Sequence, residues 1–175
     1  GRSSDVSLLD MSQLWMLEDM EPWPDEPAVG AVFTPTTYWA SPDQMDLPAQ
    51  MCAEVPARVE TVTVDGLTEW VAHLGNGFTT MMGDGGLVGD VTLHGCLVWD
   101  RYLWLDFRTR PRGTLRIHDR AGLLVQRREL IPTRHPGAFS VTYSGALEYH
   151  ERDSIPAGFG VRWKASIVET VASTG

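Results

Sequence analysis

The chain has 175 residues, a net charge of −9 and no run of about 18 apolar residues, so we expect one domain without a membrane-spanning helix. The acidic balance argues against nucleic-acid binding. The two cysteines, Cys52 and Cys96, are too few for a disulfide scaffold, and we expect free thiols. Free thiols indicate a reducing cytoplasm, and no signal peptide is visible.

The charge is unevenly distributed along the chain. Residues 1–60 carry 11 acidic side chains and two Arg, which accounts for the whole net charge of −9. Nine of the 13 Arg lie between Arg101 and Arg134. One interpretation is a solvated outer sheet face, and the other is that the acidic N-terminal part folds back on this Arg-rich region.

Residues 1–57 form an acidic, Pro-rich leader in this interpretation. Asp5 is a suitable N-cap, and the apolar spacing in Val6–Met20 predicts a helix that ends before Pro22. Its apolar side includes Trp15 and Met16. Seven of the eleven prolines lie between residues 21 and 56, so we expect an extended segment there, with a short strand at Val29–Thr34. The leader is either a lid or part of the core packing.

Residues 58–175 carry short alternating segments separated by turn signals. No helical period follows Ala57, which excludes parallel βαβ units. The pattern predicts an all-β domain, an antiparallel β-barrel of about eight strands, with a jelly roll or sandwich as the alternative. The predicted strands are Arg58–Val64, Leu67–Leu74, Phe78–Met82, Leu87–Asp100, Tyr102–Thr109, Thr114–His118, Leu123–Ile131, Phe139–Tyr149 and Phe159–Thr170.

Large aromatic residues lie on the strand faces that we assign to the interior. They are Trp70, Trp99, Tyr143 and Trp163, and Trp104 joins them if its strand has the opposite orientation. Such a lining suits a hydrophobic, partly oxygenated small molecule, because Trp and Tyr combine apolar area with one polar group. The alternative is that these rings only fill the barrel.

A few polar residues are candidates for catalysis. Glu69 and His94 could act as general acid and base if both pointed inward, although such residues usually lie on an outer face. Gln126 or Tyr143 could donate a hydrogen bond to a substrate carbonyl. The histidines lack the close spacing of a metal site, and the glycines match no nucleotide-binding fingerprint, so no metal or other cofactor is expected.

Three segments carry a resemblance to a known family: MSQLWMLEDM (Met11–Met20), VGDVTLHGCLVW (Val88–Trp99) and GVRWKASIVET (Gly160–Thr170). With them the chain resembles the small β-barrel (4+2) cyclases, or Diels–Alderases, of spirotetronate and spirotetramate polyketide biosynthesis. The resemblance implies a lipocalin-like or allene-oxide-cyclase-like barrel with an N-terminal helical lid. It also implies cofactor-independent cyclisation of a linear polyene in antibiotic biosynthesis, with Trp15 and Met16 closing the mouth of the pocket.

Two other functions are compatible with the sequence. One is a non-catalytic, lipocalin-like carrier or self-protection protein for a hydrophobic small molecule. The other is an acidic interaction protein whose leader docks on a basic partner. A homodimer is left open, and no nucleic-acid or membrane partner is expected.

Overall fold

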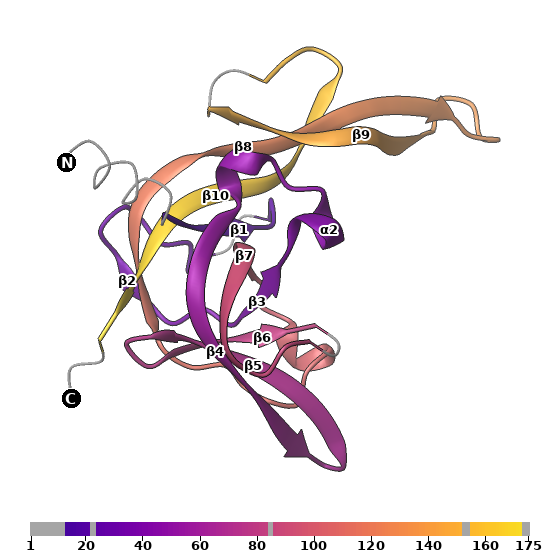
Figure 1. The fold of residues 1–175 in the computed structure, drawn as a ribbon. Helices are drawn as coiled ribbons and strands as arrows, with labels where there is room; N and C mark the ends of the chain where they lie inside the picture. Colours follow the sequence, from indigo (N-terminus) through magenta and orange to yellow (C-terminus); the bar gives the residue numbers. More distant parts are fainter. Residues whose placement is uncertain (1–12, 22–23, 84–85, 152–154, 173–175) are drawn as a thin grey trace.

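The computed structural model describes residues 13–21, 24–83, 86–151 and 155–172, and ten β-strands dominate it (Figure 1). No helix in these ranges is long and apolar enough to cross a membrane. The strands are β1 (Leu14–Glu18), β2 (Val32–Phe33), β3 (Thr37–Ala40), β4 (Ala53–Val64), β5 (Leu67–Gly75), β6 (Phe78–Met82), β7 (Gly89–Trp99), β8 (Thr114–Pro132), β9 (Phe139–Glu151) and β10 (Phe159–Val171). Three short turns of helix accompany them, namely α2 (Pro42–Met45), η1 (Ala49–Met51) and η2 (Leu103–Leu105).

Five strands close into a barrel. β4 pairs with β5, β5 with β6, β6 with β3, β3 with β7, and β7 pairs back with β4. The β3–β6 pair is parallel, so the barrel is mixed. The predicted all-β barrel is therefore confirmed, but it has five strands instead of about eight and is not purely antiparallel. The difference arises because β8, β9 and β10 lie outside the barrel.

The predicted lid helix is wrong for the part of the leader that the structure describes. Leu14–Glu18 is a strand, β1, which lies between β7 and β10 and has all five residues buried. Side chains of two core clusters cover its faces, with Leu14 and Met16 in one cluster and Trp15 and Leu17 in the other, so its apolar residues lack the one-sided pattern of a half-exposed strand. That continuous apolar run resembles a helical period in the sequence. Residues 6–12 of the predicted helix lie outside the described residues.

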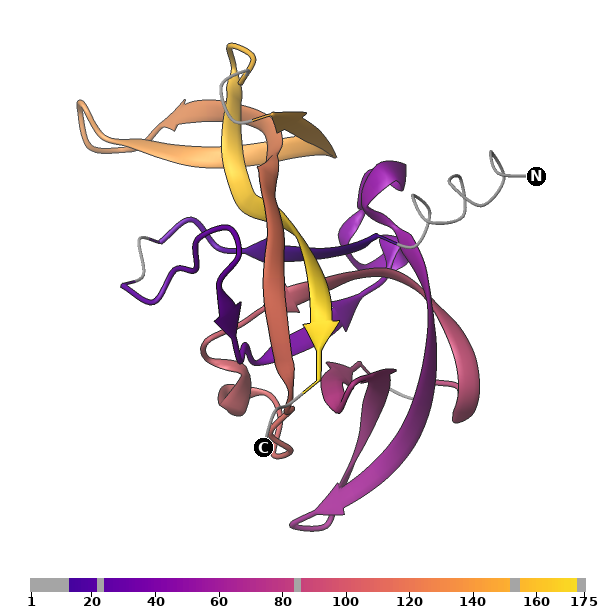
Figure 2. The same cartoon turned by 90° about the vertical axis from the view of Figure 1, so that its left-hand side faces the viewer.

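Strands β8 and β10 form a long wing beside the barrel, and the β8–β9 hairpin extends beyond it (Figure 2). The sequence predicts two strands here, Thr114–His118 and Leu123–Ile131, with a turn at residues 119–122 between them, yet β8 runs unbroken through these residues. Gly122 is needed there for a close approach, since a Cβ atom would lie 2.4 Å from the carbonyl oxygen of His150. Its role is therefore strand packing and not chain reversal.

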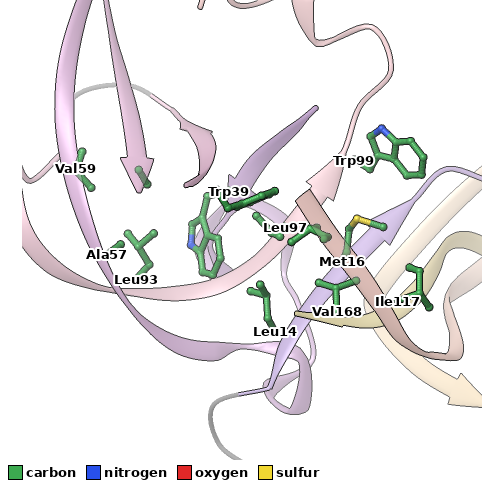
Figure 3. Close-up of a cluster of buried hydrophobic side chains, with 13 residues drawn as sticks. Leu14, Met16, Trp39, Ala57, Val59, Leu93, Leu97, Trp99, Ile117 and Val168 are labelled. Atoms are coloured by element: carbon green, nitrogen blue, oxygen red, sulfur yellow. The ribbon is translucent and has the colours of Figure 1, made fainter. Parts of the chain in front are cut away.

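The core runs continuously from the barrel into the wing (Figure 3). Its main cluster takes Trp39, Ala57, Leu93 and Leu97 from barrel strands and Ile117 from β8. Five strands enclose less space than eight, and an eight-stranded barrel is just wide enough for side chains to fill. The barrel interior is thus packed with side chains, and a ligand site has to be sought outside it.

Candidate functional site

An open cleft of about 600 Å³ lies between the leader and the chain that follows β7. We call it the Trp99 cleft. Its leader wall consists of Pro24, Asp25, Thr34 and Thr36, and its other wall consists of Trp99, Arg101, Leu103, Trp104, Phe107, Arg108, Thr109, Arg110 and Pro111. The volume is within the usual range of small-molecule sites.

The second wall exists because the chain after β7 does not form a strand. The sequence predicts a strand at Tyr102–Thr109, but Leu103–Leu105 is the short helix η2. The Asp100 carboxylate accepts a hydrogen bond from the backbone N–H of Tyr102 at 2.9 Å, which favours a turn at this point. Leu103 is buried and anchors the turn, whereas Trp104 is 66% exposed and faces the cleft.

Glu69 holds the rim of the cleft in place. Its carboxylate accepts hydrogen bonds from the backbone N–H groups of Arg108 and Thr109, at 2.9 and 2.7 Å, and from the Thr109 hydroxyl at 2.8 Å. Partial burial raises the pKa of Glu69, but these hydrogen bonds outweigh burial and leave the pKa below its ordinary value. Glu69 is therefore an ionised acceptor that positions residues 108–109.

The cleft is basic although the protein is acidic. Arg101 stacks its guanidinium 3.7 Å from the ring centroid of Trp99, and its Nη2 lies 2.9 Å from the Asp25 carboxylate. Asp25 is the single acidic residue among the lining residues, and this ion pair neutralises it. Arg108 and Arg110 are exposed and add two positive charges to the aromatic walls. An anionic group would gain electrostatic stabilisation from these charges.

A network of ion pairs outside the cleft holds the leader wall in position. Glu18 on β1 is fully buried and lies 2.6 Å from Arg120 and 3.8 Å from Arg101. Glu26 pairs with Arg120 and, at 2.9 Å, with Lys164. Of the two interpretations of the charge distribution, these ion pairs support the one in which the acidic leader folds back on the Arg-rich region, at Arg101 and Arg120.

The two acids of this network have opposite pKa shifts. Burial raises the pKa of Glu18 above its ordinary value, although Arg120 and Lys164 oppose that effect. Burial also raises the pKa of Glu26, but Lys164 and Arg120 outweigh it and lower the pKa overall. Neither residue lines the Trp99 cleft, so the network positions the wall and leaves ligand contact to the cleft residues.

The structure distributes the sequence-predicted site residues over several places. Trp99 and Trp104 line the cleft, and Glu69 supports its rim. Met16 is fully buried in the core. Trp70 and Trp163 are half-buried and pack against separate core clusters.

The other predicted residues form two groups away from the cleft. Trp15 and His94 line a smaller cavity of about 360 Å³, and the described residues of its lining include no Arg or Lys. Gln126 and Tyr143 meet on the wing through Arg162, which donates to the Gln126 side-chain oxygen at 2.7 Å and stacks 4.1 Å from the Tyr143 ring. The predicted catalytic residues are therefore not gathered in one cavity.

Several cleft residues went unnoticed in the sequence. Arg101, Phe107, Arg108 and Arg110 belong to the run RYLWLDFRTR, which contains three basic and three aromatic residues. That composition is typical of an anion-binding loop. Because the sequence predicts a strand over the same residues, the loop is not expected from the sequence. Among the described residues, no group of three or more His, Cys, Asp or Glu side chains could hold a metal ion.

The chain matches no protein-family model, no curated protein sequence and no solved structure.

Proposed function

We propose that this protein binds an anionic small molecule with a flat apolar part in the Trp99 cleft. The single observation that carries the proposal is the combination of aromatic and basic side chains in one cleft: the exposed Trp104 and the half-buried Phe107 lie beside the exposed Arg108 and Arg110. Aromatic rings favour a flat apolar body, and guanidinium groups favour carboxylate, sulfonate or phosphate. This function is close to the carrier or self-protection protein suggested by the sequence, with the site outside the barrel.

The cyclase reaction that the resemblance implies stays a prediction. We place a polyene substrate in the Trp99 cleft, because side chains pack the barrel interior and the cavity lined by Trp15 and His94 is smaller. One feature supports this location: Pro24, Asp25, Thr34 and Thr36 of the leader form a wall of the cleft, as a covering segment would. Incubation with linear polyenes tests the reaction. A product of unchanged mass supports cyclisation, and recovery of unchanged ligand leaves binding alone.

Two dyes test the binding proposal. Anilinonaphthalene sulfonate (ANS) is a flat anion, and N-phenylnaphthylamine is its analogue without the sulfonate. We expect ANS to bind the native protein and to quench tryptophan fluorescence. Each exposed Arg–sulfonate contact contributes about 1 kcal/mol after solvent screening, so the Arg108→Ala/Arg110→Ala variant should bind ANS about 30-fold more weakly.

The control for these substitutions is Arg112→Ala. Arg112 is an exposed neighbour in the same segment that does not line the cleft, and its backbone hydrogen bonds to Thr79 survive the change. Its variant should keep the wild-type affinity for ANS, and the neutral dye should bind all three proteins equally. Circular dichroism must show native strand content, because ANS also binds partly folded proteins. Equal ANS affinity in the double variant and the wild type contradicts the proposal.

A further inference from the structure

The β8–β9 hairpin ends in a two-stranded arm, residues 129–143, that projects from the body of the protein (Figures 1 and 2). β10 pairs with β8 only up to Arg127, so the arm consists of β8 and β9 alone. An isolated pair of strands is marginally stable in water and gains from a third strand or a packed face. The arm therefore needs a partner that this single copy does not supply among its described residues.

One face of the arm is apolar and uncovered. The regular pairing Leu130↔Val141 and Pro132↔Phe139 places these four residues on the same face, because directly opposed residues of a sheet share a face. Phe139 is 57% exposed and Val141 is 46% exposed. Exposed apolar patches of this kind commonly mark interaction sites.

The free edge of β9 is also unprotected. In the described part of the chain, β9 pairs with β8 only. Natural proteins usually guard an exposed edge strand with Lys, Pro or other charged residues. β9 contains no Lys or Pro, and residues 139–147 carry no charge at all. Such an edge can accept another strand through backbone hydrogen bonds.

We propose that β9 pairs edge to edge with β9 of a second copy of this chain, antiparallel and symmetric about Val141. This register places Phe139 of each copy opposite Tyr143 of the other, on the shared apolar face. Aromatic pairs are favourable across antiparallel strands. A two-fold axis makes the same contacts twice and closes the assembly at a dimer.

Charge complementarity favours a second copy as the occupant. The loop at the tip of the arm, residues 133–138, carries Arg134 and no acidic side chain. Antiparallel pairing brings this tip alongside the far end of the other copy's β9, where the exposed Glu148 lies; β9 itself, Phe139–Glu151, contains no Arg or Lys. The pairing therefore sets a basic tip beside an acidic strand end in both halves of the dimer. This inference is independent of the function proposed for the Trp99 cleft.

The test is the oligomeric state of the full chain, measured by sedimentation over a wide range of concentration. The wild type should be a dimer, and Val141→Lys should weaken dimerisation at least about tenfold, because it brings two like charges together at the symmetry axis. Leu67→Lys is the matched control, since Leu67 is 53% exposed but lies on β5, away from the arm. That variant should remain dimeric.

Cross-linking provides a second measurement that does not depend on a destabilising charge. Opposed residues of antiparallel strands have Cα atoms about 5 Å apart, which suits a disulfide. Val141→Cys should therefore form a disulfide-linked dimer under mild oxidation, and Leu67→Cys should not. A monomeric wild type overturns the proposal. The free edge of β9 would then be a site for a strand of a different protein. A dimer that survives Val141→Lys, or a Val141→Cys variant that fails to cross-link, also overturns it.

Discussion

Replacing Glu69 with Gln tests whether one carboxylate holds the rim of the Trp99 cleft. The substitution keeps the shape of the side chain but removes its charge, and one amide nitrogen replaces an acceptor oxygen. Three donors, two of them backbone N–H groups, point at this carboxylate from 2.7 to 2.9 Å. A hydrogen bond to a charged group contributes about 1.5–3 kcal/mol to stability when it is shielded from solvent. On a half-exposed rim, water can form replacement hydrogen bonds, which reduces this contribution.

We therefore expect Glu69→Gln to lower the free energy of unfolding by about 2 kcal/mol near neutral pH. Urea unfolding of the two proteins measures the difference. Glu54→Gln is a control, since it changes an exposed carboxylate for which no hydrogen bond to the rim exists among the described residues. ANS affinity should fall in the Glu69 variant as well, because residues 108–109 lose their anchor.

The pH dependence gives the sharper result. The pKa of Glu69 lies below its ordinary value in the folded protein, so folding favours the ionised carboxylate. The contribution of Glu69 is therefore present above the pKa of the unfolded chain, and it is lost as the pH falls through the folded-state pKa. The stability difference between wild type and variant should shrink on acidification. Equal stability at neutral pH, or a difference that persists in acid, would refute this account of Glu69.

Two further predictions follow from the packing. Trp104→Ala should weaken ANS binding about tenfold, measured by titration, while leaving the urea midpoint near that of the wild type, because the Trp104 side chain is largely exposed. Gly95→Ala should cost about 3 kcal/mol in unfolding free energy, because φ at Gly95 is +141° and a Cβ atom would lie 1.9 Å from the Ala40 carbonyl oxygen. Gly86→Ala is its control, since a Cβ at Gly86 meets nothing within 4 Å. A Gly95 variant as stable as the Gly86 variant would contradict the close approach.

Local sequence signals predict the hairpins of the barrel well. Asp65-Gly66 lies at the turn between β4 and β5, where both residues have the positive φ that such a turn requires. The alternation in β7 also predicts its inner face, since Leu93, Leu97 and Trp99 belong to one core cluster. These features depend on residues that are close together in the sequence, so local sequence patterns are sufficient to predict them.

The path of the sheet depends on contacts between residues far apart in the chain. Nothing near Leu14–Glu18 indicates that β10 will cover one edge of this segment and β7 the other. Likewise, the choice between a turn and a close approach at Gly122 depends on β9. The barrel was therefore predicted with too many strands, although most strand positions were correct.

The candidate site was harder to predict for the same reason. The sequence indicates Trp99 and Trp104 as aromatic lining residues, but it places them in the barrel interior, which is packed with side chains. The basic half of the cleft comes from an irregular segment, whose conformation depends on the hydrogen bond from the Tyr102 N–H to Asp100 and on the distant Glu69. Because the sequence predicts a strand over residues 102–109, neither the contact with Asp100 nor the contact with Glu69 is expected from it.

The position of β1 has a consequence for the order of folding during synthesis. Its residues pair with both β7 and β10, and Leu14 lies opposite Val168. The five barrel strands all precede residue 100, so the barrel can close while β8–β10 are still being synthesised. β1 has one edge on β7 by then, but its other edge stays unpaired until β10 arrives. Joining strands so distant in the chain is slow, because the loop must close before the contact forms. The seam between barrel and wing should therefore be the last part of the sheet to form.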